Sequence, residues 1–191
     1  MKKILAIFVF LNAQFPAIGQ EKQAELYSEK YRPQYHFSPP KNWINDPNGL
    51  VLFEGEYHLF YQHNPFGNVW GHMTWGHAVS KNLVNWTNLP PAIPEENGIM
   101  IFSGTVVVDK QNSSGFAGKS GKVPLVAIYT GHQEGVNQSQ HLAYSLDKGR
   151  TWIKYDKNPI LDLGKKDFRD PKVFWYEPEK KWVMVVALPI E

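Results

Sequence analysis

Two aspartates in similar contexts are the strongest candidates for chemistry in this sequence. Asp46 stands in Asn-Asp-Pro-Asn-Gly and Asp170 stands in Arg-Asp-Pro, and an apolar, β-branched run follows each of them. Two carboxylates that share a pocket can stabilise or attack a positively charged carbon and move protons, as in glycoside hydrolysis. The alternative is structural, since Asp-Pro and Asn-Gly are common turn sequences in which Asp caps backbone amides.

A repeated hairpin pattern favours the functional interpretation. Apolar hairpins with Gly, Pro or Asn at their corners begin at residues 46, 103 and 170, which are 57 and 67 residues apart. A second hairpin follows each of the first two, and these second hairpins lead to Trp86 and Trp152. Two hairpins per repeat predict four strands per repeat.

Repeats of four short strands are typical of the blades of a β-propeller. We therefore expect an all-β fold, and we rank a propeller ahead of a sandwich, which does not require the same unit to recur. The innermost strand of each blade lines the central channel, so equivalent strand ends should converge on one pocket. Those ends carry Asn45-Asp46, Phe102-Ser103 and Arg169-Asp170.

Composition excludes several classes of protein. The 191 residues are 42% hydrophobic and 20% charged with a net charge of +2, which argues against a disordered tail, a coiled coil or a polytopic membrane protein. No basic excess points to a nucleic-acid partner. Cysteine is absent, which excludes disulfides and zinc-thiolate sites, and the histidine spacings match no zinc motif, so we expect no metal.

Residues 1–19 are predicted to be a secretory signal peptide. Lys2 and Lys3 precede the apolar run 4–11, and Ala17-Ile18-Gly19 supplies the small residues of a cleavage site before Gln20. The apolar run is too short to span a bilayer, which takes about 20 residues. We therefore expect a secreted or periplasmic protein with no membrane association after the signal is removed, and with no cysteine for a lipid anchor.

The side chains near the predicted pocket suit a carbohydrate. Flat aromatic rings pack on the apolar faces of sugars, and neutral amides and hydroxyls fix sugar hydroxyl groups. Arg169 could hold the adjacent carboxylate ionised or form a plain surface ion pair. The competing interpretation is that about half of these aromatics fill the space between blades. The candidates are Trp43, Phe66, Trp70, Trp75 and Phe102 among the aromatics, and Asn45, Gln62 and Ser103 among the polar residues.

The segment 43–49, Trp-Ile-Asn-Asp-Pro-Asn-Gly, closely resembles the signature of glycoside hydrolase family 32, the invertases, inulinases and levanases. Further motifs of that family follow in order as YHLFYQ (57–62), WGH (75–77), FSG (102–104) and RDP (169–171). The resemblance implies a five-bladed propeller followed by a β-sandwich. It also implies retaining hydrolysis that releases fructose from the terminal β-D-fructofuranosyl residues of levan, inulin or sucrose, with no cofactor.

The resemblance also implies roles for individual residues. Asp46 would be the nucleophile, Asp170 would stabilise the transition state, and Arg169 would support Asp170. The fructose pocket would be lined by Asn45, Gln62, Trp70, Phe102 and Ser103. The general acid/base of the family is a Glu in an E-C-P motif downstream of RDP, and neither Glu177, Glu179 nor Glu191 matches that motif.

These patterns lead us to expect that residues 20–191 form the N-terminal part of a catalytic propeller, about its first two and a half blades. The rest of the propeller and the sandwich would lie outside this sequence, and the 191-residue chain alone would be inactive. Two alternatives stay open. One is a fructan-binding fragment without catalysis, and the other is a fructosyltransferase in the full-length form.

Overall fold

The computed structural model describes residues 27–33 and 35–189, and the predicted signal peptide lies outside them. Within this part of the chain the regular elements are β-strands, apart from one turn of 3₁₀ helix at Glu177–Glu179. No helix in it is long and apolar enough to cross a membrane. The all-β prediction is confirmed.

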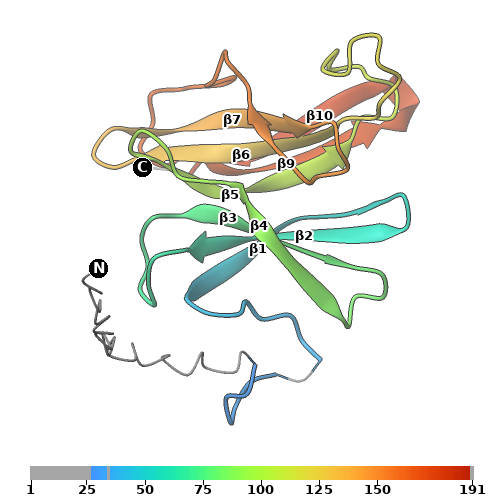
Figure 1. The fold of residues 1–191 in the computed structure, drawn as a ribbon. Coiled ribbons are helices and arrows are strands. Elements are labelled where there is room, and N and C mark those ends of the chain that lie inside the picture. Colours follow the sequence, from blue (N-terminus) through green and yellow to red (C-terminus); the bar gives the residue numbers. More distant parts are fainter. Residues whose placement is uncertain (1–26, 34, 190–191) are drawn as a thin grey trace, which may run out of the picture.

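The strands form three antiparallel sheets, in which neighbours along the chain are also neighbours in the sheet (Figure 1). The first sheet contains β1 (Trp43–Phe53), β2 (Glu56–Asn64), β3 (Thr74–Ser80) and β4 (Trp86–Ile93). The second contains β5 (Ile99–Val108), β6 (Leu125–Gln133), β7 (Asn137–Ser145) and β8 (Ile153–Lys154). The third pairs β9 (Arg169–Tyr176) with β10 (Lys181–Ala187). Two four-stranded sheets and one further hairpin are therefore present, and the hairpins at 46, 103 and 170 each open a sheet, as the hairpin spacing predicts.

Strand β6 joins the three sheets because both of its faces are buried. Leu125, Ala127 and Tyr129 point into the core shared with the first sheet, while Val126 and Ile128 point into the core shared with β9 and β10. This alternation follows from the two-residue period of a strand. Each fully buried large apolar side chain contributes about 1.5–3 kcal/mol, so the second sheet is fixed from both sides.

The outer turns of the first two sheets are built alike, which confirms the internal repeat at the level of hydrogen bonds. In each turn a serine hydroxyl and an Asx oxygen accept backbone N–H groups, and a tryptophan indole donates to a turn carbonyl. The residues are Ser80, Asn82 and Trp86 in the first sheet, and Ser145, Asp147 and Trp152 in the second. Side chains thus satisfy turn amides that no strand partner reaches.

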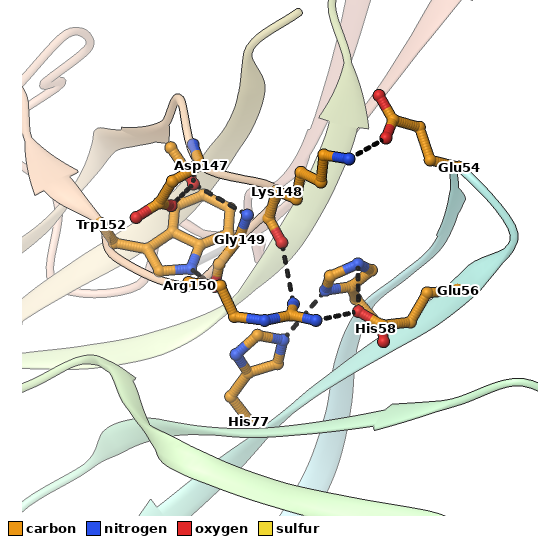
Figure 2. A network of polar contacts seen from close by, with 10 residues as sticks. Glu54, Glu56, His58, His77, Asp147, Lys148, Gly149, Arg150 and Trp152 are labelled. Carbon is orange, nitrogen blue, oxygen red and sulfur yellow. Dashed lines mark hydrogen bonds and ion pairs between the residues drawn. The ribbon is translucent and has the colours of Figure 1, made fainter.

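The turn of the second sheet also contacts the first sheet through charged groups (Figure 2). Arg150 lies 2.5 Å from Glu56, and Lys148 lies 2.5 Å from Glu54. Behind them, the rings of His58 and His77 share a hydrogen bond of 3.1 Å between Nδ1 and Nε2. His58 and His77 are buried, whereas the two acid–base pairs are partly exposed.

Burial controls the ionisation of both imidazoles. It lowers the pKa of His77 to about 3, and His58 and Arg150 add to the decrease. Burial likewise lowers the pKa of His58, against the attraction of Glu56. Both rings are therefore neutral in the folded protein at neutral pH, which leaves one N–H to bridge them.

Gly104 allows β5 and β6 to approach closely. A Cβ at this position would lie 2.2 Å from the carbonyl oxygen of Ile128 and 2.7 Å from the Cα of Tyr129. Both atoms belong to the backbone of β6, so they cannot rotate away as a flexible side chain would. Only glycine fits at this position without displacing a strand.

Replacing Gly104 with alanine should therefore destabilise the chain by about 3 kcal/mol, the upper range for overpacking a core. The matched control is Gly67→Ala, because a Cβ there meets nothing within 4 Å. We expect that control to change stability by less than about 0.5 kcal/mol. Urea unfolding followed by tryptophan fluorescence measures both, and similar midpoints for the two variants would contradict the close approach.

The histidine pair should make stability depend on pH. The folded-state pKa of His77 lies below its ordinary value of 6.5, so its contribution is complete above pH 6.5 and declines as pH falls toward 3. Between pH 6 and 5 the free energy of unfolding should fall, with about 1 kcal/mol per pH unit of the slope due to this group. His77→Asn should be less stable at pH 7 and show a flatter slope. Equal slopes for the two proteins in urea titrations would show that His77 does not set the pH dependence.

Candidate active site

The predicted site residues lie at irregularities in the first strand of each sheet. The pairing register shifts in β1 between Ile44 and Pro47, and in β5 between Ile101 and Gly104. In β9 the pairing register with β10 likewise shifts between Arg169 and Lys172. A bulge leaves its extra residues outside the ladder and re-aims their side chains. The same feature, a bulge in the first strand of a sheet, therefore occurs at Asn45-Asp46, Phe102-Ser103 and Asp170-Pro171.

A pocket of about 380 Å³ lies where these strands meet. Three of the predicted residues line it, and they come from three different sheets: Asp46, Ser103 and Asp170. Its remaining wall residues are Pro47, Asn48, Gly104, Thr105, Pro171 and Lys172. The two aspartates supply the only carboxylates among these wall residues.

Hydrogen bonds orient the carboxylate of Asp46. The hydroxyl of Ser103 donates to Oδ2 over 2.7 Å, and the side-chain amide of Asn45 donates to Oδ1 over 3.3 Å. The indole N–H of Trp43 in turn donates to Asn45 Oδ1 over 3.2 Å. Each oxygen of Asp46 thus has one donor and a remaining lone pair directed elsewhere.

Asp170 has an unusual backbone conformation. Its φ of +61° is in the left-handed region, where Asp is more tolerated than most residues but is still uncommon. The protein around Asp170 removes part of its hydration, which raises the pKa of its carboxyl above 3.8; Arg169 opposes the increase and Asp46 adds to it. The negative charge of Asp46 therefore makes Asp170 harder to ionise.

Arg169 contacts other groups than its neighbour. Its Nη1 donates to Oε1 of Gln138 over 3.0 Å and also forms an ion pair with Asp167. The positive charge of Arg169 still acts on Asp170 across space. Its guanidinium is not among the walls of the pocket.

The other predicted residues take different places. Gln62 is buried, and its amide donates to the carbonyl of Ile101 over 2.9 Å at the start of the β5 bulge. Trp70 is half exposed and meets Phe102 edge to face, with ring centroids 6.2 Å apart. Phe66 is exposed, whereas Trp75 is fully buried and its indole donates to the carbonyl of Phe102. The aromatics thus divide between a rim beside the pocket and the core.

Sequence reasoning missed a second set of polar residues behind the pocket. These side chains are buried in the strands of the second sheet and reach the segment 168–170. They are Thr130, Gln138 and Gln140. The signal available was the alternation Gln-Ser-Gln at 138–140, which places two amides on one face of a strand. In residues 27–33 and 35–189 no cluster of three His, Asp or Glu side chains could hold a metal ion.

Comparison with known proteins identifies close relatives. A levanase of Bacillus subtilis is 65% identical over 167 residues, which cover 86% of this chain and 24% of the levanase. Invertase 2 of Saccharomyces cerevisiae is 44% identical over 96% of this chain and 35% of its own length. The crystal structure of an exo-inulinase from Aspergillus awamori superposes with a TM-score of 0.80 at 45% identity, covering 84% of this chain and 36% of that one.

The chain therefore spans about a quarter to a third of the length of these relatives. A structure of β-fructofuranosidase from Schwanniomyces occidentalis in complex with fructosyl-erythritol also superposes, with a TM-score of 0.79 at 44% identity. Residues 36–190 match the family described as the N-terminal domain of the glycosyl hydrolases family 32. This chain, with its propeller-type sheets and the two aspartates at their meeting point, belongs to glycosyl hydrolase family 32.

Proposed function

We propose that this chain carries the nucleophile and the transition-state-stabilising carboxylate of an enzyme that releases fructose from fructans or sucrose with retention of configuration. Asp46 is the nucleophile, and Asp170 stabilises the positively charged sugar of the transition state. Residues 20–191 are part of the catalytic propeller.

The observation that carries this proposal is the orientation of Asp46. Ser103 and Asn45 hold its two oxygens in a pocket open to solvent, and Asp170 shares the walls of that pocket. A carboxylate held in place before substrate arrives loses little further freedom on reaction. Each oxygen of Asp46 accepts one of these hydrogen bonds and keeps another lone pair free. That lone pair can form a covalent bond to the sugar.

The chemistry then proceeds in two displacements. An oxygen of Asp46 bonds to the anomeric carbon of fructose as the bond from that carbon to the leaving oxygen breaks, and an acid protonates the leaving oxygen. Water next attacks the anomeric carbon, the acid's conjugate base takes a proton from that water, and the ester to Asp46 breaks. Two inversions at one carbon retain its configuration. Asp170 remains ionised and hydrogen-bonds the sugar hydroxyls.

The names of the relatives support the substrate class and the destination of the protein. They include a levanase, an invertase and several exo-inulinases, the latter described as extracellular. We therefore assign levan, inulin or sucrose as substrate and export as the route. We assign contacts with the sugar or its neighbouring unit to Arg169, Trp70 and Phe102, although none of the three lines the pocket.

The residue that acts as general acid and base is not among the wall residues of the pocket. The walls of the pocket hold two carboxylates, and both already have roles. A positioned acid contributes about 10²- to 10⁴-fold to the rate. Residues 20–191 alone should therefore release no measurable fructose, whereas a fusion with the part of the Bacillus subtilis levanase that follows its matching segment should release fructose from levan, inulin or sucrose.

In that fusion, Asp46→Asn should lower kcat by about 10⁴- to 10⁶-fold, the scale of losing a covalent nucleophile. Because Asn and Asp are similar in size, the fold should be preserved. An unchanged melting temperature would confirm this. Fructose release is measured enzymatically and products are separated by chromatography. Oligosaccharide products longer than the substrate would favour transfer over hydrolysis, and an active Asp46→Asn fusion would overturn the assignment of the nucleophile.

Asp170→Asn in the same fusion should lower kcat by about 10²- to 10³-fold, as when one stabilising group is removed. Stability should not fall with it. Because the pKa of Asp170 is raised in the fold, its ionisation at pH 7 opposes folding, and the neutral amide lacks that cost. A large drop in melting temperature together with unchanged kcat would assign Asp170 to structure.

A further inference from the structure

A chain of buried polar groups runs from the second sheet to the segment that carries Asp170. It begins at Gln140, which is fully buried in β7. Its Oε1 accepts a hydrogen bond from the hydroxyl of Thr130 on β6 over 2.9 Å, and its Nε2 donates to the carbonyl of Phe168 over 2.6 Å. Both ends of one amide are therefore used, and its orientation is fixed.

Thr130 continues the chain to Asp170. Its hydroxyl, also fully buried, accepts the backbone N–H of Asp170 over 3.1 Å while it donates to Gln140. A hydroxyl has one proton to donate, so the bond to Gln140 leaves a lone pair directed at that N–H. Thr130 thus meets the residue whose backbone is left-handed.

Gln138 holds the two residues before Asp170. Its Oε1 accepts the backbone N–H of Phe168 and the Nη1 of Arg169, each over 3.0 Å. Its Nε2 faces Nδ1 of His132 at 3.3 Å, and the ring of His132 stacks on Phe102 with centroids 4.4 Å apart. The same amide therefore connects Arg169 with the aromatic rim of the pocket.

We propose that Thr130 and Gln138 are positioning residues that hold the 168–170 segment so that the carboxylate of Asp170 faces Asp46 across the pocket. The inference rests on the function proposed above. It assigns to the second sheet a part in the reaction, although neither side chain lines the pocket.

Positioning residues are required here because the backbone of Asp170 is in the left-handed conformation. We call the contacts of Thr130 and Gln138 with residues 168–170 the clamp. A left-handed residue other than glycine persists only where its surroundings fix it. The backbone N–H of Asp170 lies in a partly buried place and donates to the hydroxyl of Thr130 there. The strand ladder does not provide an acceptor here, because the pairing of β9 with β10 is out of register between Arg169 and Lys172. The Thr130 hydroxyl replaces the missing ladder acceptor.

The test uses two substitutions at Thr130, one that matches its volume and one that keeps its hydroxyl but lacks its methyl group. Thr130→Val removes the hydroxyl, and Thr130→Ser retains it. In the levanase fusion, Thr130→Val should lower kcat by about 10²-fold with little change in KM, the scale of a displaced catalytic group, and Thr130→Ser should stay within about threefold of the parent. In the 191-residue chain, amide hydrogen exchange at Asp170 should speed up in the Val variant and not in the Ser variant.

A second pair of variants covers the case in which Thr130→Val does not fold. Gln138→Met removes the acceptor of Phe168 and Arg169, whereas Gln138→Glu keeps an oxygen there, so kcat should fall only in the former. Lower melting temperatures with kcat unchanged, or slow exchange at Asp170 in Thr130→Val, would overturn the proposal. A parent fusion that releases no fructose would refute the proposed function instead, and the exchange rates would still decide whether Thr130 holds Asp170.

Discussion

The burial of β6 on both faces fixes the geometry of the whole molecule. Alternate side chains of this one strand enter two separate cores, so the first and third sheets are each positioned against the second. A strand covered on one face would leave the sheets free to pair differently. Because apolar side chains occupy both faces of β6, polar groups that act in chemistry lie at the strand ends and at the irregular positions of the ladders.

The residues of the candidate site lie at bulges, which are irregular positions of this kind. The first strand of each sheet has an irregularity in its pairing, and β1 has a second one between Asn48 and Val51. These irregularities leave Asn45-Asp46, Phe102-Ser103 and Asp170-Pro171 outside the ladders. The displaced groups need other partners, and they find them across sheets. Ser103 donates to Asp46, and the hydroxyl of Thr105 donates to the carbonyl of Pro171 over 2.8 Å. Hydrogen bonds between sheets thus help to hold the pocket together.

Much of this architecture could be predicted from the sequence, because hairpin spacing and alternation are local properties. The recurrence of apolar hairpins at 46, 103 and 170 indicated three sheets and brought Asp46 and Asp170 to one end of them. The direction of Arg169 could not be predicted, since it depends on Gln138, a residue 31 positions away. The clamp at Thr130 was equally hidden, because a lone Thr in an apolar strand has no pattern of its own.

The self-contained outer turns bear on how the protein is made. Each sheet is a meander of consecutive strands, and the Ser-Asx-Trp turns close their hydrogen bonds with residues a few positions away. The first sheet can therefore complete its hydrogen bonds before the second has formed. Asp46 is in place with the first sheet, and Asp170 arrives with the β9–β10 hairpin. The pocket is consequently assembled late, after the scaffold that orients it.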